Sequence, residues 1–325
     1  MKIAVSGASG FLGSRLVPAL VAAGHEVFAL ARSPGSARTA EALGATAIDG
    51  DLNAPPLKLP PCDAVIHAAA HFRFTGPREA FRSANVAGTR ALLGAAREAG
   101  ARRFVYVSAA AVVMDDKGSP MVGVDETAPM FPDSFSPYIA TKAEAEALVR
   151  AANGPDFTTI ALRPPGIWGA GDAFSSALPL LVKRRQFGFI GGGRFGCVTC
   201  HVDNVVEALI CAIDRGRGGA AYFINDPEPT TLRDFLTKVA AALGLKIDRA
   251  PSLPYGIAWA LGRLMEGWAW ATRAKSDPPM SRTMVRLIGR PFTTDDSMAR
   301  AELGYVGRVS RTEGLKSYDA ELTQG

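Results

Sequence analysis

The apolar residues of this chain recur with two different periods along its first half. Short apolar, β-prone runs predict buried strands at residues 2–6, 26–31, 45–48, 63–67, 103–108 and 158–163. Apolar residues at helical spacing predict helices at residues 11–23, 36–43, 78–99 and 138–151. Strands that alternate with helices build a parallel sheet covered on both faces. The pattern therefore predicts an α/β fold with a doubly wound, Rossmann-type parallel sheet.

The pattern changes after Pro164-Pro165, where the alternation becomes irregular and richer in Gly, Pro and Trp. We interpret this as a change of role within one body, because no low-complexity linker or internal repeat separates the halves. The expected cofactor-binding core is residues 1–165, completed by part of 195–230. The expected smaller, substrate-binding part is residues 166–194 and 231–325.

One apolar stretch of the second half, residues 254–272, is rich in tryptophan and is interrupted by Arg263 and Glu266. It carries Trp259, Trp268 and Trp270. Such a stretch can form a wall for an apolar substrate, a helix packed on the core, or an interfacial helix that touches a membrane surface. Amphipathicity alone does not choose among these alternatives.

Composition excludes several classes of protein. Apolar residues make up 48% of the 325 residues, which is enough for a sizeable core. The 36 basic and 31 acidic residues leave a scattered charge of +5, so we expect no nucleic-acid partner. No uncharged apolar run is long enough for a spanning helix. A strand-like run follows Met1 directly, so we expect no signal peptide, reduced cysteines and a cytoplasmic enzyme.

The segment Cys197-Val198-Thr199-Cys200-His201 matches the pattern for covalent haem attachment and half of a zinc site. Haem attachment would require export, and no second Cys/His pair completes a zinc tetrad. We therefore predict no metal and interpret the segment as a short strand leading into His201-Val202-Asp203.

A glycine-rich loop joins the first strand to the first helix. Gly7, Gly10 and Gly13 have the spacing that binds a dinucleotide when it lies between a strand and a helix. The first glycine permits a tight turn, the second lets the backbone approach the pyrophosphate, and the third allows close packing of helix and strand. The helix then directs its unpaired N–H groups at the phosphates. A bound dinucleotide is the prediction.

The residues at the end of the second strand indicate whether the bound dinucleotide is NAD or NADP. An acidic residue there binds the ribose 2′-hydroxyl of NAD, whereas an arginine accommodates the 2′-phosphate of NADP. The chain reads Leu30-Ala31-Arg32-Ser33 and has no carboxylate at this point. Arg32 therefore favours NADP, with NAD left open.

Tyr138 and Lys142 are four residues apart and so share one face of the predicted helix. The ammonium is expected to lower the pKa of the phenol into the range of a general acid/base. Such a group transfers a proton to a carbonyl as hydride arrives, or from an alcohol as hydride leaves.

Together these motifs resemble the extended short-chain dehydrogenase/reductase family, within the NAD-dependent epimerase/dehydratase superfamily. The matching pieces cover nearly the whole chain: residues 6–13, 50–52, 67–70, 85–89, 136–142, 163–169, 201–205 and 299–305. The chain is most similar to the 3-beta-hydroxysteroid dehydrogenase and dihydroflavonol reductase branch. It lacks the acidic residue at the second strand that common epimerases favour, and Pro164-Pro165 stands where they usually carry an Asn.

The resemblance implies roles for particular residues. Tyr138 would be the acid/base, Lys142 would bind the nicotinamide ribose and tune it, and Asn85 would support the site from behind. Asp51 and Leu52 would lie at the adenine, and Ala68, Ala69 and Ala70 along the cofactor. The full implied cofactor site is Gly7, Ser9, Gly10, Phe11, Leu12, Gly13, Arg32, Asp51, Leu52, Ala68, Ala69, Ala70, Asn85, Tyr138, Lys142, Pro164 and Ile167.

The chain departs from the family pattern at the strand before the active site. The family ends this strand with two adjacent Ser/Thr residues, of which the second holds the substrate oxygen, and here that position falls on Ala109. Ser108 is its neighbour, and adjacent side chains of a strand point to opposite faces. Either Ser108 serves through a local register change, Ser134 or Ser136 replaces it, or catalysis is weak. We favour Ser108 as the third catalytic residue.

Three functions remain open from the sequence. The first is an NADP-dependent oxidoreductase that interconverts a ketone and a secondary alcohol on a hydrophobic, steroid-like or polycyclic molecule. The second is a nucleotide-sugar epimerase or dehydratase. The third is a cofactor-binding protein with little turnover, because of Ala109. The resemblance also implies a homodimer, although no residue pattern here shows one.

Overall fold

The computed structural model describes residues 1–274 and 276–322, and a seven-stranded sheet forms its centre. Every neighbouring pair in this sheet is parallel. The strands, in order across the sheet, are β3 (Thr46–Asp49), β2 (Glu26–Ala31), β1 (Lys2–Ser6), β4 (Ala64–His67), β5 (Arg103–Val107), β7 (Thr158–Arg163) and β12 (Ala221–Phe223). The strand order reverses between β1 and β4, and ligands bind such folds at that point, beyond the carboxyl ends of the strands.

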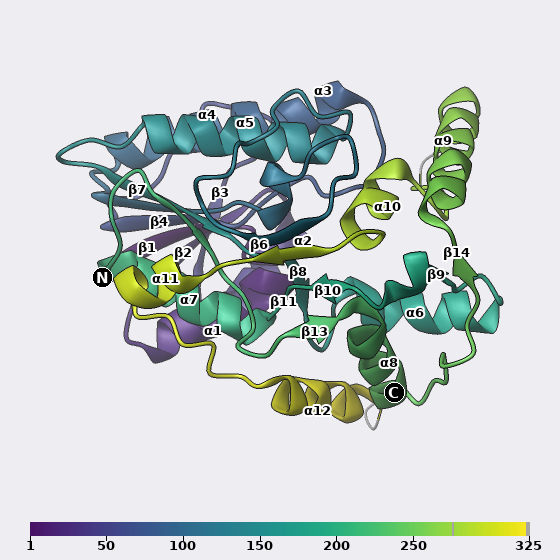
Figure 1. Ribbon diagram of the computed structural model, residues 1–325. Helices are drawn as coiled ribbons and strands as arrows, with labels where there is room; N and C mark the ends of the chain where they lie inside the picture. Colours follow the sequence, from purple (N-terminus) through teal and green to yellow (C-terminus); the bar gives the residue numbers. More distant parts are fainter. Residues whose placement is uncertain (275, 323–325) are drawn as a thin grey trace.

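Helices cover both faces of this sheet (Figure 1), which confirms the predicted doubly wound fold. The apolar residues of α1 (Phe11–Ala22), α2 (Pro34–Ala42) and α7 (Val202–Asp214) pack on one face. Those of α4 (Gly88–Glu98) and α5 (Pro137–Ala151) pack on the other. Strands that are buried on both faces need nearly continuous apolar runs, and for that reason the runs were visible in the sequence.

The single helix predicted over residues 78–99 is wrong. The structure divides this segment into α3 (Arg78–Phe81), a π-helical segment η1 (Arg82–Ala87) and α4. A π-helix turns more widely than an α-helix and shifts the phase of the residues that follow. The wider turn leaves Asn85 and Val86 buried in the same segment. A pattern with one period cannot show such a local change.

The remaining elements form smaller units around the central sheet. The second sheet contains β13 (Thr230–Thr231), β10 (Gly196–Cys197), β15 (Phe292–Thr294) and β6 (Met121–Val124). Two strand pairs join β8 (Gly166–Trp168) to β11 (Thr199–His201), and β9 (Phe189–Ile190) to β14 (Ser252–Leu253). Short 3-10 segments are η2 (Ala110–Val113) and η3 (Gly191–Gly193). The later helices are α6 (Ala173–Lys183), α8 (Leu232–Ala242), α9 (Tyr255–Ala271), α10 (Arg282–Ile288), α11 (Ser297–Leu303) and α12 (Arg311–Leu322).

Helix α9 stands at the edge of the molecule, far from the central sheet (Figure 1). The β12 strand, in contrast, joins the edge of that sheet beside β7 although it follows the irregular segment. The division of the chain into a cofactor part and a substrate part stays a prediction.

The cysteine-containing segment forms strands, as predicted. Cys197 lies in β10, and Cys200 and His201 lie in β11, which runs directly into α7. His201 accepts a hydrogen bond from the Asp203 backbone N–H at its Nδ1 and so caps that helix. The buried Cys200 thiol lies 3.8 Å from the Tyr305 hydroxyl. These side chains serve the packing of the core.

Candidate active site

The glycine loop packs closely on the neighbouring strand. Gly7 has a φ of +81°, and a Cβ there would lie 2.7 Å from the Ala69 backbone nitrogen. A Cβ on Gly13 would collide with the Gly7 carbonyl oxygen. The first glycine is therefore required by its conformation and by the approach of the loop after β4, and the third by the approach of α1 to the loop.

The N-terminus of α1 lacks any internal partner for its first N–H groups. Gly10 caps the helix without a side chain, and the first turn has no acidic residue. The first α-helical hydrogen bond runs from Ser14 to Gly10, so the N–H groups of Phe11 and Leu12 have no acceptor within the helix. Ser9 and Gly10 are exposed beside them. This cradle of free N–H groups fits the pyrophosphate of a dinucleotide.

Arg32 lies where the sequence placed it, directly after β2. Its side chain is exposed and forms no ion pair with any of the described residues. The neighbouring Ser33 caps α2 and accepts a hydrogen bond from the Ser36 backbone N–H. An unpaired guanidinium beside the glycine loop is available to an anionic group of a ligand.

The turn after β3 holds the two residues implied at the adenine. Asp51 Oδ1 accepts hydrogen bonds from the backbone and side-chain nitrogens of Asn53, at 2.9 and 3.2 Å. Leu52 packs so closely on α4 that a Cβ on Gly88 would lie 2.9 Å from the Leu52 Cβ. The turn is therefore fixed by its own contacts.

The loop after β4, with Ala68, Ala69 and Ala70, is held by a buried hydrogen-bonded chain. His67 Nδ1 lies 2.6 Å from the Ser6 hydroxyl, and its Nε2 lies 2.8 Å from the Thr89 hydroxyl. Burial lowers the pKa of His67 to about 3, with a smaller contribution from Lys142. The imidazole is therefore neutral and joins the ends of β1 and β4 to α4.

Asn85 connects this loop to α5. Its side-chain oxygen accepts a hydrogen bond from the His71 backbone N–H at 2.7 Å, and its side-chain nitrogen donates to the His71 carbonyl and to Thr141. Thr141 is adjacent to Lys142 in the sequence. Asn85 thus lies behind the Tyr138–Lys142 pair and fixes the position of the helix that carries it.

Tyr138 and Lys142 lie in the first two turns of α5, whose N-cap is Ser136. Lys142 is only 2% exposed, and its Nζ donates a hydrogen bond to the Val107 carbonyl at 2.6 Å. The same ammonium lies 4.1 Å from the centre of the Tyr106 ring. Burial lowers the pKa of Lys142 to about 7, although the nearby Glu146 carboxylate acts in the opposite direction.

The prediction that Lys142 lowers the pKa of Tyr138 is wrong for this structure. Burial raises the pKa of the Tyr138 phenol above its ordinary value. The Lys142 ammonium is held by the Val107 carbonyl and lies over the Tyr106 ring. The loss of water around the Tyr138 phenol therefore has the larger effect on the pKa of Tyr138. Tyr138 is therefore a protonated, neutral phenol at neutral pH.

Ser108 has a different partner from the one expected. Its hydroxyl is buried and donates to the Glu146 carboxylate at 2.6 Å. Glu146 in turn accepts hydrogen bonds from the Arg163 guanidinium, at 2.6 to 3.1 Å, and both of these charged side chains are 0% exposed. Ala109, the position to which the resemblance assigns the substrate-binding hydroxyl, is buried and carries only a methyl group.

The two alternative serines also have structural partners. The Ser134 hydroxyl donates to the Asp116 carboxylate at 2.6 Å and accepts a bond from the Ser136 backbone N–H. The Ser136 hydroxyl accepts the Ile139 backbone N–H and so caps α5. These contacts position the start of the helix that carries Tyr138.

Pro164 and Ile167 lie beyond the end of β7, on the same side as the ends of β4 and β5. The Pro164 carbonyl accepts a hydrogen bond from the Ala110 backbone N–H at 2.8 Å, and Ile167 pairs with Cys200 in the β8–β11 ladder. The segment after β7 is thereby attached to the segment after β5, next to Ala109.

The loop after β4 and the loop before α5 carry aromatic side chains that sequence reasoning did not single out, and one of these rings contacts Tyr138. The Phe72 ring meets the Tyr138 ring edge-on at 4.9 Å and is 53% exposed, and Phe74 packs on Phe72 at 5.4 Å. Phe135 contacts Trp259 of α9 at 5.3 Å. A hydrophobic residue in a loop carries no periodic signal, so only the folded chain shows that these rings lie together.

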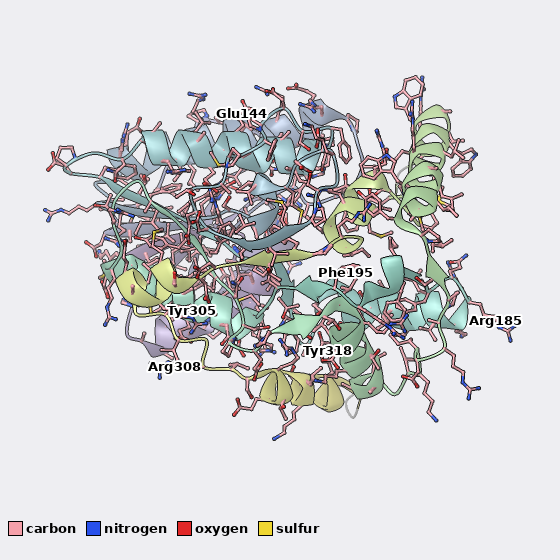
Figure 2. The ribbon with its side chains drawn as sticks, viewed as in Figure 1. Glu144, Arg185, Phe195, Tyr305, Arg308 and Tyr318 are labelled. Atoms are coloured by element: carbon pink, nitrogen blue, oxygen red, sulfur yellow. The ribbon has the colours of Figure 1, made fainter. Side chains whose placement is uncertain are left out.

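The three tryptophans of residues 254–272 do not share one role. Trp259 is half-buried and faces Phe135, whereas Trp268 and Trp270 are exposed. Figure 2 shows α9 at the edge of the molecule, with several of its side chains projecting outward. The prediction of a substrate wall therefore applies at most to the Trp259 side of the helix.

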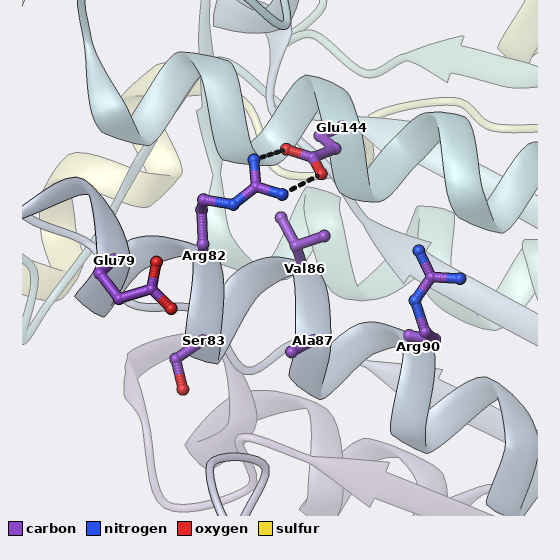
Figure 3. A pocket seen from close by; sticks show the side chains of 7 residues that line it. All are labelled: Glu79, Arg82, Ser83, Val86, Ala87, Arg90 and Glu144. Atoms are coloured by element: carbon purple, nitrogen blue, oxygen red, sulfur yellow. Dashed lines mark hydrogen bonds and ion pairs between the residues drawn. The ribbon is translucent and has the colours of Figure 1, made fainter.

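A separate pocket of about 320 Å³ lies between η1 and α5 (Figure 3). The Arg82 guanidinium crosses it and forms two hydrogen bonds with the Glu144 carboxylate, at 2.6 and 2.9 Å. Its lining includes neither Tyr138 nor Lys142 and none of the glycine loop. This pocket is not the candidate active site.

Comparison with known proteins agrees with this geometry. Residues 4–255 match the model of the "3-beta hydroxysteroid dehydrogenase/isomerase family". A 4-hydroxy-2-methyl-3-oxo-4-farnesyl-3,4-dihydroquinoline-1-oxide ketoreductase from Stigmatella aurantiaca is 43% identical, over 97% of this chain and 95% of that protein. A 2-alkyl-3-oxoalkanoate reductase from Stenotrophomonas maltophilia is 35% identical, over 98% of this chain and 99% of that protein.

Among solved structures, MoeE5 in complex with UDP-glucuronic acid and NAD superposes with a TM-score of 0.74. It is 25% identical and covers 100% of this chain and 99% of its own. The family match, the relatives and the tyrosine–lysine pair beside the glycine loop all agree. The chain belongs to the 3-beta hydroxysteroid dehydrogenase/isomerase family and is an oxidoreductase of the extended short-chain dehydrogenase/reductase type.

Proposed function

We propose that this protein is an NADPH-dependent ketoreductase that reduces a ketone on a lipophilic molecule to a secondary alcohol. The observation that carries the proposal is Tyr138, a neutral phenol one helical turn from a buried lysine and in contact with the Phe72–Phe74 ring pair. Both relatives described above are named as reductases of a ketone or an oxoalkanoate, and the substrate of the first carries a farnesyl chain.

The chain's own residues fit the cofactor. The N–H groups at the start of α1 would hold the pyrophosphate, and Arg32 would bind the 2′-phosphate that distinguishes NADPH from NADH. Asp51 and Leu52 would lie at the adenine, and Lys142 at the nicotinamide ribose. When bound, NADPH supplies the hydride for the reduction.

Tyr138 supplies the proton to the substrate oxygen. Because burial raises the pKa of the phenol, Tyr138 holds its proton at neutral pH and can donate it to the oxygen that gains negative charge. Lys142, held by the Val107 carbonyl and over the Tyr106 ring, would position the nicotinamide ribose.

Ser108 is a positioning residue in this proposal. Its hydroxyl holds the Glu146 carboxylate, which acts on Lys142, and it does not take the place of the serine missing at Ala109. The substrate oxygen then has Tyr138 as its donor, with no side-chain hydroxyl at position 109.

The test is NADPH oxidation with two series of compounds. One is a series of ketones with lengthening apolar chains, and the other a set of sugar nucleotides. We expect kcat/KM to rise with the apolar length of the ketone, since the rings near Tyr138 bury that length. Turnover of sugar nucleotides with a cofactor retained through purification would contradict the proposal and favour an epimerase or dehydratase.

A further inference from the structure

The loop that carries Phe72 is attached to the rest of the molecule at two points. On one side of Phe72, the His71 backbone exchanges two hydrogen bonds with the Asn85 side chain, at 2.7 and 3.2 Å. On the other side, the Asp277 carboxylate binds residues 73–75. Phe72 lies between these two attachments, so the position of its ring depends on both.

The second attachment is made by a single carboxylate. Asp277 Oδ1 accepts hydrogen bonds from the Thr75 backbone N–H at 2.9 Å and from the Thr75 hydroxyl at 2.7 Å. Asp277 Oδ2 accepts one from the Phe74 backbone N–H at 3.1 Å, and the Arg73 guanidinium lies 3.6 Å from Oδ1. Hydrogen bonds to a charged acceptor are stronger than those between neutral groups. Both oxygens of one side chain therefore hold three consecutive residues of the loop.

Asp277 lies in a segment that is itself fixed. It follows α9 and precedes Pro278-Pro279, whose rings restrict their own backbone angles and those of the residue before them. Beyond these prolines, Ser281 is buried and caps α10. The Arg282 backbone and guanidinium both donate to the Glu266 carboxylate of α9, at 2.6 Å. The loop is therefore held from a rigid segment that lies 202 and 203 positions away in the sequence.

The ring between the two attachments faces the candidate acid/base. Phe72 meets the Tyr138 ring edge-on at 4.9 Å and packs on Phe74 at 5.4 Å. The Phe72 side of this contact is open, because the residue is 53% exposed. A half-exposed ring beside the proton donor presents apolar surface to a molecule that binds there.

We propose that Phe72 determines the specificity for apolar ketones and that Asp277 is the positioning residue that holds Phe72 in place. The inference rests on the proposed function, because it concerns the ketone that approaches Tyr138. An apolar chain would pack on the exposed side of the Phe72 ring, and its burial there would favour long substrates over short ones. Asp277 would touch neither substrate nor cofactor and would act only through the loop.

The experiment compares kcat and KM of the full chain for a long-chain ketone and for a short, water-soluble ketone. Phe72→Ala and Asp277→Ala should each lower kcat/KM for the long ketone by about tenfold, mainly through KM, and for the short ketone by less than about threefold. Asp277→Asn keeps one oxygen for the loop N–H groups and should fall between the wild type and Asp277→Ala. Asp234→Ala is the matched control and should behave as the wild type does. It also removes an ion pair and a contact with a threonine hydroxyl, but on α8, away from α5 (Figure 1).

A double-mutant cycle separates positioning from a general loss of structure. If Asp277 acts through Phe72, adding Asp277→Ala to Phe72→Ala should change kcat/KM for the long ketone by less than about twofold. Independent effects of the two changes would instead multiply to about 100-fold. Urea denaturation of each variant shows whether it is folded under the conditions of the assay.

Trypsin cleavage after Arg73, followed by mass spectrometry, tests the attachment without any substrate. Cleavage requires the loop to open locally, so Asp277→Ala should speed it by at least about tenfold and Asp234→Ala should not. Unchanged cleavage in Asp277→Ala, an unchanged preference for the long ketone in Phe72→Ala or Asp277→Ala, or independent effects in the double mutant would each overturn the inference. A wild type that reduces no ketone would refute the proposed function and the specificity role with it. Cleavage after Arg73 would still show whether Asp277 holds the loop, so the two failures are distinguishable.

Discussion

Two regions of this protein depart from the usual distribution of side chains, in which charged groups are exposed and apolar groups are buried. Beneath the start of α5, Lys142, Glu146 and Arg163 are charged groups with almost no exposure to water. On helix α9, Trp268 and Trp270 are apolar groups that are 67% and 84% exposed to water. Burying charges costs free energy unless they are paired, and exposing apolar surface forgoes the main stabilising effect of folding.

The difference shows how each region can be tested. In the buried region every charge depends on a partner, so a single change leaves another charge stranded. On α9 the Trp268 and Trp270 side chains are largely exposed, so their replacement should hardly affect folding. Buried charges and exposed apolar side chains both reduce stability locally, and both are expected at functional sites.

The largest expected effect on stability is that of Glu146→Gln. It would leave the Arg163 guanidinium buried without a counter-charge, at a cost of about 3–5 kcal/mol in the free energy of unfolding. It would also remove the carboxylate that raises the pKa of Lys142, so the pH profile of kcat should move to lower pH. Urea denaturation and a pH–rate series measure the two effects.

Two further variants serve as controls for this prediction. Glu144→Gln on the same helix breaks the more exposed pair with Arg82 and should cost less than about 1 kcal/mol. Glu146→Leu/Arg163→Met replaces both buried charges with apolar groups and should recover most of the lost stability. Equal losses for Glu146→Gln and Glu144→Gln would show that the buried region is not special.

Lys142→Met separates catalysis from stability. It should lower kcat by about 10²–10³, because the amine that would position the nicotinamide ribose is lost. It should also stabilise the fold near neutral pH, because it removes a buried amine. Since burial lowers the pKa of Lys142 from 10.5 to about 7, the unfolded wild type binds more protons between these values, and its stability rises with pH there. The variant should lack that rise in denaturation curves at pH 7 and 9, and a variant less stable than the wild type at pH 7 would refute this account.

Arg32 lies outside both regions, and the variant Arg32→Ala tests which cofactor the site prefers. The exposed guanidinium should matter to NADPH and hardly to NADH, so we expect Kd for NADPH to rise about 10- to 100-fold and Kd for NADH less than threefold. Fluorescence titration with each cofactor measures both constants, with Arg102→Ala as a control at another exposed arginine. Equal weakening of both cofactors would contradict the assignment to NADPH.

Ser108→Ala has the smallest expected effect on the rate. Losing the hydrogen bond to Glu146 should cost about 1–3 kcal/mol of stability, the usual contribution of a bond to a charged group. The rate should fall less than tenfold if Ser108 only positions Glu146. A loss of 10²–10³ without a matching loss of stability would restore Ser108 as the donor to the substrate oxygen.

The fold and the cofactor loop were largely predictable because their signals are local. Apolar runs predicted six of the seven strands of the central sheet, all but β12, and Gly7, Gly10 and Gly13 lie where the spacing placed them. The position of Arg32 after β2 followed from the same strand. These features depend on neighbours in the sequence, and the sequence shows them directly.

The chemistry around Tyr138 depended on contacts that the sequence does not show. The Ser108 hydroxyl meets a carboxylate 38 positions away, and the Lys142 ammonium a carbonyl 35 positions away. The pKa of Tyr138 followed burial rather than its neighbour four residues on. The π-helical turn that holds Asn85 has no signature of its own. Each of these errors arose where a distant contact decided the outcome.

The measurement that tests the central claim most directly is NADPH oxidation by Tyr138→Phe with a lipophilic ketone that the wild type reduces. Phenylalanine keeps the ring that packs on Phe72 and removes the proton. The account predicts a loss in kcat of at least 10²-fold with the Kd for NADPH unchanged. Turnover at the wild-type rate would contradict it, because the proton would then come from another group.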